Sequence, residues 1–141
     1  MPESSELPVS EYAFPGPLRD QLVAAILSGE KTSTTSLVVQ YELEGEPLPA
    51  VGDRAVVIDS NDAPVCIEEI TEVREVRVAD VDLAHAIAEG EGFTSVAEWR
   101  SGHEQFWHGD EFRAAMGDPD FTVDDETRAV LVTFRALPLG L

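Results

Sequence analysis

Strand-like and helix-like stretches alternate irregularly along the 141 residues of this chain, and this order most limits the folds open to it. Four stretches have the apolar or β-branched character of strands: residues 34–41, 55–58, 64–78 and 128–137. Helical periodicity covers residues 17–28 and 79–88 and resumes after Ser95. A parallel sheet with helical crossovers would show a regular strand–helix period. The irregular order therefore predicts an α+β fold, in which helices pack on a small mixed sheet or barrel.

Local signals mark the ends of several of these elements. Pro17 suits the first turn of a helix, and Gly29 supplies the stop at its end. Residues 95–98 have the form of a capping box, which predicts that a helix begins there. Within residues 64–78 the apolar phase shifts between residues 67 and 70, so we expect a bulge or a bend at that point.

The cysteine count and the N-terminal sequence indicate a location and a domain boundary. Cys66 is the only cysteine, so no internal disulfide can form and a cytoplasmic location is expected. Residues 1–12 are acidic and contain two prolines, unlike a signal peptide, so we expect a flexible tail followed by one domain over residues 13–141. No apolar run approaches the roughly 20 residues of a membrane span, so no membrane partner is expected.

The net charge limits the partners of the chain without fixing an oligomeric state. Nine basic residues against 28 acidic ones give a net charge of −19. A field of this sign repels polyanions, and the arginines are scattered rather than clustered. Tight non-specific binding to long nucleic acid is therefore disfavoured. A small neutral ligand, or a locally positive pocket on an acidic body, is compatible with this charge.

Lys31, in the stretch SGEKTSTTS, is the only lysine, and the other eight basic residues are arginines. One interpretation is an exposed side chain near the end of a helix, where a positive charge suits the helix dipole. Arginine would serve equally well there, but only lysine can lose its proton when it is partly buried. Thr34 follows three residues later. The second interpretation is therefore that Lys31 activates the Thr34 hydroxyl as a nucleophile.

Two further stretches offer candidate functional residues. The turn Glu89-Gly90-Glu91-Gly92 is either a solvated acidic loop or a place where a carboxylate faces a pocket and tunes the lysine pKa. On the next helix, Trp99, His103 and Phe106 share a face, which is more typical of a core than of a platform for stacking bases.

No metal and no cofactor are expected. His103 and His108 are five residues apart, which does not suit two ligands on one face of a helix. The chain also lacks a Walker loop, a dinucleotide fingerprint and a nucleophile elbow.

Four blocks occur in an order typical of one family: LSGEKTSTTSL, VGDRAVVIDSNDAPVCIEEITEV, EGEGFTSVAEWRSGHEQFW and RAVLVTFRAL. Together they span about residues 14–137, nearly the whole chain, and resemble the ASCH domain family, which is related to the PUA-like RNA-associated folds. The resemblance implies a small PUA-like mixed β-barrel with helices packed over one opening. It also implies a cleft in which the lysine loop meets the acidic turn.

The resemblance further implies a reaction. Some compact relatives in the family are amidohydrolases that remove the acetyl group from the exocyclic amine of acetylated cytidine. Carried over by position, Thr34 is the nucleophile, Lys31 is its base, and Glu91 orients the lysine or handles the proton of the leaving amine. The expected function is therefore hydrolysis of a modified nucleoside or a related small amide.

The candidate binding residues come from the acidic turn, the aromatic helix and the VGDR block: Glu89, Trp99, His103 and Arg54. The chain departs from the compact amidohydrolases in two places. Ser36 stands where they carry an arginine, and residues 108–127 are an addition. Both differences leave the substrate open. The alternatives are an RNA-binding or RNA-cleaving module that uses the same cleft, and a non-catalytic ligand-binding domain.

Overall fold

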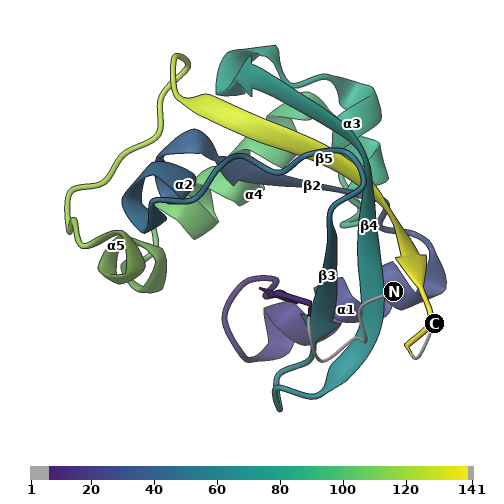
Figure 1. Ribbon diagram of the computed structural model, residues 1–141. Coiled ribbons are helices and arrows are strands. Elements are labelled where there is room, and N and C mark those ends of the chain that lie inside the picture. Colours follow the sequence, from purple (N-terminus) through teal and green to yellow (C-terminus); the bar gives the residue numbers. More distant parts are fainter. Residues whose placement is uncertain (1–6, 140–141) are drawn as a thin grey trace.

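A five-stranded mixed sheet forms the centre of the computed structural model, which describes residues 7–139 (Figure 1). The strands are β1 (Val9–Ser10), β2 (Ser33–Leu37), β3 (Arg54–Ile58), β4 (Pro64–Arg77) and β5 (Arg128–Leu137). Their order across the sheet is β1-β3-β4-β5-β2. β1 pairs with β3 in parallel, and the other three pairs are antiparallel. The α+β class is confirmed, with a sheet whose hydrogen bonding leaves β1 and β2 as edges within the described residues.

The helices lie on two parts of this sheet. They are α1 (Pro17–Ser28), α2 (Val38–Glu44), the short 3₁₀ helix η2 (Val78–Asp80), α3 (Leu83–Ala88), α4 (Val96–Trp107) and α5 (Asp110–Met116). In Figure 1, α1 lies beside the lower half of β3 and β4, whereas α2, α4 and α5 gather near the other half of the sheet. None of the helices in residues 7–139 combines the length and the apolar character that crossing a membrane requires.

Two separate apolar cores correspond to these two parts. The smaller core joins α1 to β3, β4 and β5 through seven buried residues: Tyr12, Leu22, Val23, Ile26, Val57, Cys66 and Phe134. The larger core joins α3, α4 and α5 to β2 and β5, with Trp99 and Trp107 at its centre. Because β4 and β5 pass through both parts, they hold the two cores in one domain.

The ends of α1 and α4 agree with the sequence. α1 begins at Pro17 and ends at Gly29, whose φ of 86° is the left-handed conformation that favours glycine. Ser95 accepts a hydrogen bond from the backbone N–H of Glu98 and so caps α4 as predicted. A register shift in the β4–β5 pairing lies between Ile70 and Glu72, slightly beyond the predicted bend.

Two of the predicted elements are wrong in part. The strand predicted over residues 34–41 ends at Leu37, and the chain then turns into α2. The Gln40 side chain accepts a hydrogen bond from the Leu37 N–H at 2.9 Å, which stabilises the start of that helix. The helix predicted over residues 79–88 is divided into η2 and α3. Asp82 caps α3 by accepting from the N–H of His85 at 2.8 Å, so a new helix begins there.

The predicted flexible tail, residues 1–12, is also corrected where the structure describes it. Val9 and Ser10 pair with β3, and Tyr12 is buried. Arg19, itself 1% exposed, donates hydrogen bonds to the carbonyl oxygens of Tyr12 and Ala13. These contacts fix residues 9–13 against α1. Residues 1–6 of the predicted tail lie outside the described part of the chain.

Candidate functional site

The lysine loop and the acidic turn lie against each other. The backbone N–H of Thr32 donates to the carbonyl oxygen of Ala88 at 2.8 Å. Gly90 has a φ of 68°, and a Cβ atom built on it would lie 2.5 Å from the carbonyl oxygen of Glu30. Only glycine allows so close an approach of two backbones. This packing brings two segments nearly 60 residues apart in the sequence into one site.

Lys31 is buried at this contact, with 2% of its surface exposed. Its Nζ donates to the carbonyl oxygens of Ser33 at 2.9 Å and of Glu89 at 3.2 Å. It also lies 3.8 Å from Glu89 Oε1 and 3.8 Å from Glu91 Oε2. The interpretation of Lys31 as an exposed lysine at a helix end is therefore wrong. Burial of a lysine ammonium is costly without a compensating charge, and the acidic turn supplies that charge.

Glu89 is the centre of the cluster. Its side chain is 1% exposed and accepts a hydrogen bond from the indole N–H of Trp99. His103 Nε2 lies 3.2 Å from Glu89 Oε2, and the ring of His103 stacks on Trp99 with centroids 4.4 Å apart. The Thr35 hydroxyl donates to Glu89 Oε1 at 3.4 Å. Glu89 therefore joins the lysine loop, α3 and α4 through one carboxylate.

The environment changes the pKa values of these groups. Burial lowers the pKa of Lys31 from its ordinary value of 10.5, against the opposing charges of Glu89 and Glu91. Burial also raises the pKa of Glu91 above its ordinary value of 4.5. For Glu89, burial favours the neutral form, but the hydrogen bond and charge of His103 outweigh it and hold the pKa below 4.5. The Lys31 and Glu91 pKa values are thus brought closer together, which eases proton exchange between them.

A titration of the single lysine tests this effect directly. Because the chain has one lysine, ¹³Cε-lysine labelling gives one side-chain NMR signal. We expect its midpoint below 10.5, and lower still in Glu91→Gln, because that change removes a carboxylate that stabilises the ammonium. Glu30→Gln, at the exposed neighbouring position, is the control and should leave the midpoint unchanged. A wild-type midpoint at or above 10.5 would contradict the prediction.

The hydroxyls of β2 divide between its two faces. Ser33 donates to the carbonyl oxygen of His85 at 3.2 Å, and the Thr35 hydroxyl lies 2.8 Å from His85 Nε2. Side chains alternate along a strand, so Thr34 points to the opposite face, together with Ser36. Thr34 is half-buried, and within residues 7–139 its hydroxyl makes no hydrogen bond.

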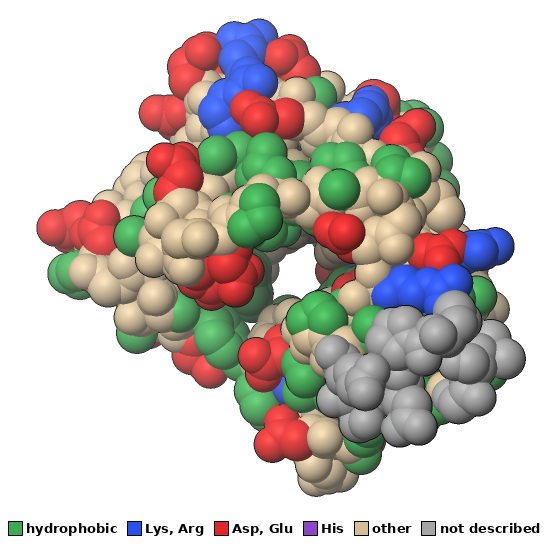
Figure 2. Space-filling model, in the orientation of Figure 1, with side chains coloured by type: hydrophobic (Ala, Val, Ile, Leu, Met, Phe, Trp, Pro, Cys, Tyr) green, Lys and Arg blue, Asp and Glu red, His purple; other side chains and the backbone are tan. Residues whose placement is uncertain are grey.

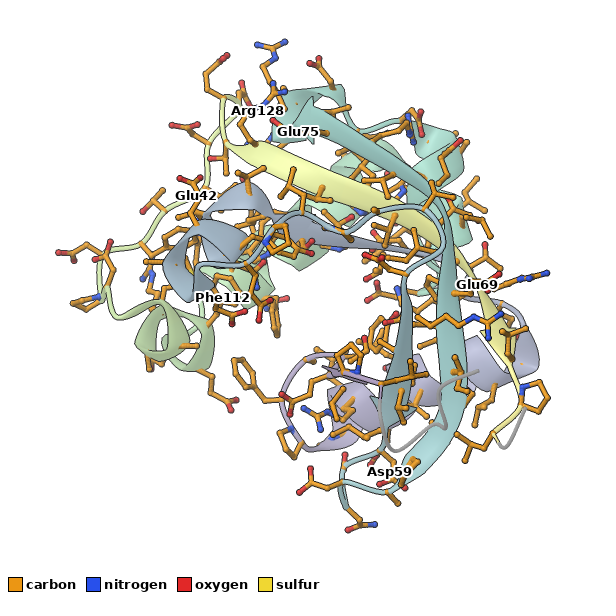
Figure 3. The ribbon with its side chains drawn as sticks, in the orientation of Figure 1. Glu42, Asp59, Glu69, Glu75, Phe112 and Arg128 are labelled. Carbon is orange, nitrogen blue, oxygen red and sulfur yellow. The ribbon has the colours of Figure 1, made fainter. Side chains whose placement is uncertain are left out.

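The candidate binding residues are not all brought together. Glu89, Trp99 and His103 belong to the cluster around Lys31. Trp99 is fully buried, so it contributes to the core and is not a platform open to a ligand. Arg54 pairs with Glu69 at 2.7 Å on the outer side of β4, away from the central opening (Figure 3). Arg54 therefore lies outside the cluster.

Three residues of the site were missed in the sequence. His85 precedes Glu89 by one helical turn, and its Nε2 lies 3.9 Å from Glu89 Oε2. Burial lowers the pKa of His85. Glu68 and Tyr12 form a buried hydrogen bond near Lys31, whose Nζ is 5.8 Å from the centre of the Tyr12 ring. The two consecutive glutamates of the VCIEEI strand were a usable signal, because adjacent residues of a strand face opposite sides.

Glu89, Glu91 and His103 could together hold a metal ion. One ligand atom from each lies within 4.8 Å of the others. Oxygen and imidazole ligands suit several divalent metals. The Lys31 ammonium already lies against both carboxylates, however, and its positive charge would repel a metal ion there. The expectation that the chain binds no metal stays a prediction.

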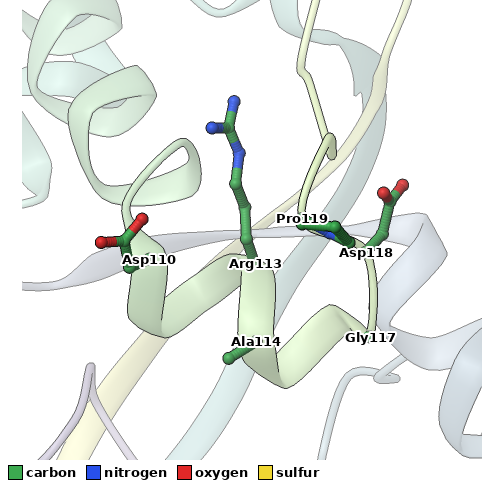
Figure 4. Close-up of a pocket in the computed structure, with 6 residues that line it drawn as sticks. All are labelled: Asp110, Arg113, Ala114, Gly117, Asp118 and Pro119. Carbon is green, nitrogen blue, oxygen red and sulfur yellow. The ribbon is translucent and has the colours of Figure 1, made fainter.

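The surface has a central opening and a shallow depression elsewhere. Figure 2 shows the opening, with acidic side chains along its edge. The depression, about 210 Å³ in volume, lies on α5 and the turn after it and is lined by Asp110, Arg113, Ala114, Gly117, Asp118 and Pro119 (Figure 4). None of its lining residues belongs to the Lys31 cluster, so the depression and the candidate site are separate.

The geometry defines a compact α+β domain whose one lysine is buried between two carboxylates at the meeting of two loops. The chain belongs to the ASCH domain family, whose model matches residues 10–137. The predicted family is therefore confirmed, and with it a fold of the PUA-like type.

Solved structures agree with this assignment. The ASCH domain from Lactobacillus crispatus is 30% identical, with a TM-score of 0.73 over 92% of this chain and 79% of that one. A protein from Enterococcus faecalis is 23% identical, with a TM-score of 0.77 over 97% and 77%. The ASCH protein from Zymomonas mobilis is similar in fold alone, with 15% identity and a TM-score of 0.52 over 93% and 72%. None of the curated proteins compared with the chain matches it.

Proposed function

We propose that this chain is a hydrolase that cleaves the amide of a modified nucleoside or a related small molecule at the Lys31 site. The observation that carries the proposal is the burial of the only lysine between Glu89 and Glu91, with its pKa lowered by that burial. A lysine of this kind is available as a base nearer to neutral pH than a solvated one.

Thr34 is the proposed nucleophile. Lys31 Nζ donates to the carbonyl oxygen of Ser33, the residue that directly precedes Thr34. The hydroxyls of Ser33 and Thr35 are engaged by α3, whereas that of Thr34 is not engaged within residues 7–139. Nucleophilic catalysis needs a hydroxyl free to react with a base close to it, and Thr34 directly follows the residue whose carbonyl oxygen Lys31 contacts.

The proposed steps keep protons and bonds balanced. Neutral Lys31 accepts the proton of the Thr34 hydroxyl while the threonine oxygen attacks the acyl carbon of the substrate. The bond from carbon to nitrogen then breaks, and the leaving amine takes a proton from Glu91, whose raised pKa favours the acid form. Water then gives a proton to the Glu91 carboxylate and attacks the acyl carbon of the acyl-threonine ester. The bond from that carbon to the threonine oxygen breaks, the threonine oxygen takes the proton from the Lys31 ammonium, and the acid is released. Lys31 and Glu91 then return to their starting protonation states.

The RNA-binding alternative has weaker support. It needs a positive patch, and four arginines that could contribute to one each lie beside carboxylates: Arg54 with Glu69, Arg74 with Asp82, Arg77 with Asp80 and Glu126, and Arg100 with Glu104 and Asp125. In Figure 2 the blue side chains likewise lie next to red ones. Arginines engaged in this way offer little to a phosphate backbone.

Release of cytidine from N4-acetylcytidine tests the proposed reaction. We expect turnover by the wild type and a loss of about 10²-fold or more in kcat for Thr34→Ala, because the covalent route is then closed. Thr32→Ala, two residues away and exposed, is the matched control and should keep wild-type turnover. Loss of activity in Thr35→Ala together with full activity in Thr34→Ala would show that Thr34 is not the nucleophile. A ligand that binds and stays intact would favour the non-catalytic alternative.

A further inference from the structure

Glu68, on β4, carries a carboxylate that the proposed reaction does not use. Glu68 is buried, with 8% of its residue surface exposed. The Tyr12 hydroxyl donates a hydrogen bond to Glu68 Oε2. Within residues 7–139 no group donates to Oε1, and no fully buried side-chain oxygen lacks a partner. Oε1 therefore keeps some accessible surface and is available as a hydrogen-bond acceptor.

The position of Glu68 relates it to the Lys31 site. Its partner Tyr12 has its ring 5.8 Å from Lys31 Nζ. The charge of Glu68 acts on the pKa values of both Lys31 and Tyr41, and Tyr41 lies 2.7 Å from the hydroxyl of Ser36. Ser36 shares its face of β2 with the proposed nucleophile. Glu68 is therefore linked to the Lys31 site through Tyr12, and it lies close enough to Lys31 and Tyr41 for its charge to act on both.

The charges in this space disfavour an anion. Lys31 already donates to two carbonyl oxygens and lies against the carboxylates of Glu89 and Glu91, so its charge is neutralised within the protein. Glu68 has no cation within salt-bridge distance in residues 7–139, and Tyr12 gives it only one hydrogen bond. A buried carboxylate with an open acceptor is stabilised by an N–H donor and repels a negative ligand.

We infer that Glu68 sets the substrate class of the Lys31 site: its Oε1 accepts a hydrogen bond from an N–H donor of an uncharged or cationic ring compound, and its charge excludes anionic substrates. This inference rests on the proposed function, because it takes the Lys31 cluster to be the substrate site. The amide and amino groups of nucleoside bases belong to the favoured class. A ligand that must place a phosphate or a carboxylate beside Glu68 does not.

Three probes of one shape and different charge test the inference without any turnover: benzamidine, benzamide and benzoate. Binding is measured by NMR titration, read from the Lys31 ¹³Cε signal and the Tyr12 ring signals so that binding elsewhere is recognised. We expect benzamidine to bind more tightly than benzamide, and benzoate to bind about tenfold more weakly than benzamide or worse. Glu68→Gln should weaken the binding of benzamidine by about tenfold. The difference in affinity between benzamidine and benzoate should therefore be smaller in this variant.

Glu69→Gln is the matched control, because Glu69 is the next residue of β4 and faces the outer side with Arg54 and Arg135. It should leave the order of the three probes unchanged. Equal binding of benzoate and benzamidine by the wild type would overturn the inference, as would a Glu68→Gln variant that behaves like Glu69→Gln, or the absence of any probe effect at Tyr12 and Lys31. The expected binding order without hydrolysis of any acylated nucleoside would instead count against the proposed function alone.

Discussion

Lys31→Arg is expected to lose turnover by about 10²- to 10⁴-fold, the usual contribution of a general base. Arginine keeps the positive charge between Glu89 and Glu91 but does not deprotonate in a protein. The variant therefore separates the role of Lys31 as a base from its role as a buried cation. The measurement is kcat/KM on the acylated nucleoside that the wild type turns over.

Lys31→Met is the companion variant. It should lose the same activity and, in addition, unfold at a lower urea concentration, because Glu89 and Glu91 then lose the ammonium that lies between them. Wild-type activity within a few fold in Lys31→Arg would show that Lys31 acts only through its charge. The base assigned to the reaction would then be wrong, even if the site still bound its substrate.

Glu89→Gln is expected to cost the largest share of stability of any single change at the site, about 3–5 kcal/mol in the free energy of unfolding. The change removes the charge that compensates Lys31 and His103, both of which stay buried. In addition, the carboxylate that accepts the hydrogen bond from the Trp99 indole N–H is replaced by a neutral amide. Urea unfolding measures the loss, and Glu91→Gln, at a position 18% exposed, is the matched control with a smaller effect.

The stability difference between wild type and Glu89→Gln should depend on pH. The pKa of Glu89 is held below its ordinary value of 4.5, so the stability that it contributes is present above 4.5 and is lost as the pH falls through its folded value. The pKa of His103 is raised above 6.5: burial acts against this, but the hydrogen bond and charge of Glu89 outweigh it. The stability that His103 contributes is present below pH 6.5 and is lost as the pH rises through the pKa of His103 in the folded protein. The difference should therefore be largest between about 4.5 and 6.5, and a difference independent of pH would contradict this account.

Much of the fold could be predicted from local patterns. α1, β3 and β5 were found because each has a clear period and clear end signals, such as Pro17 and Gly29 around α1. α2 was missed because Val38, Val39 and Tyr41 favour a strand in isolation. Its helical state depends on the turn at the end of β2, where Gln40 bonds to the N–H of Leu37. Tertiary context overrode propensity there.

The candidate site was predicted less completely. The sequence suggested Lys31, Glu89 and Glu91 as neighbours, and the structure brings these three together. It did not indicate which of the two glutamates is fully buried, because that depends on how α3 and α4 pack. Glu68 was missed for a similar reason, since the phase of a strand next to a bulge is not fixed by the strand alone.

The sequence by itself determined that one lysine, with hydroxyls behind it and an acidic turn downstream, belongs to an α+β domain of a recognisable family. The tertiary structure alone decided that this lysine is buried rather than solvated. The physical reason is the close backbone contact at Gly90, which brings Glu89 and Glu91 to Lys31. Their negative charges offset the cost of burying the ammonium. Charge compensation between residues 58 positions apart is a property of the folded chain and not of either segment.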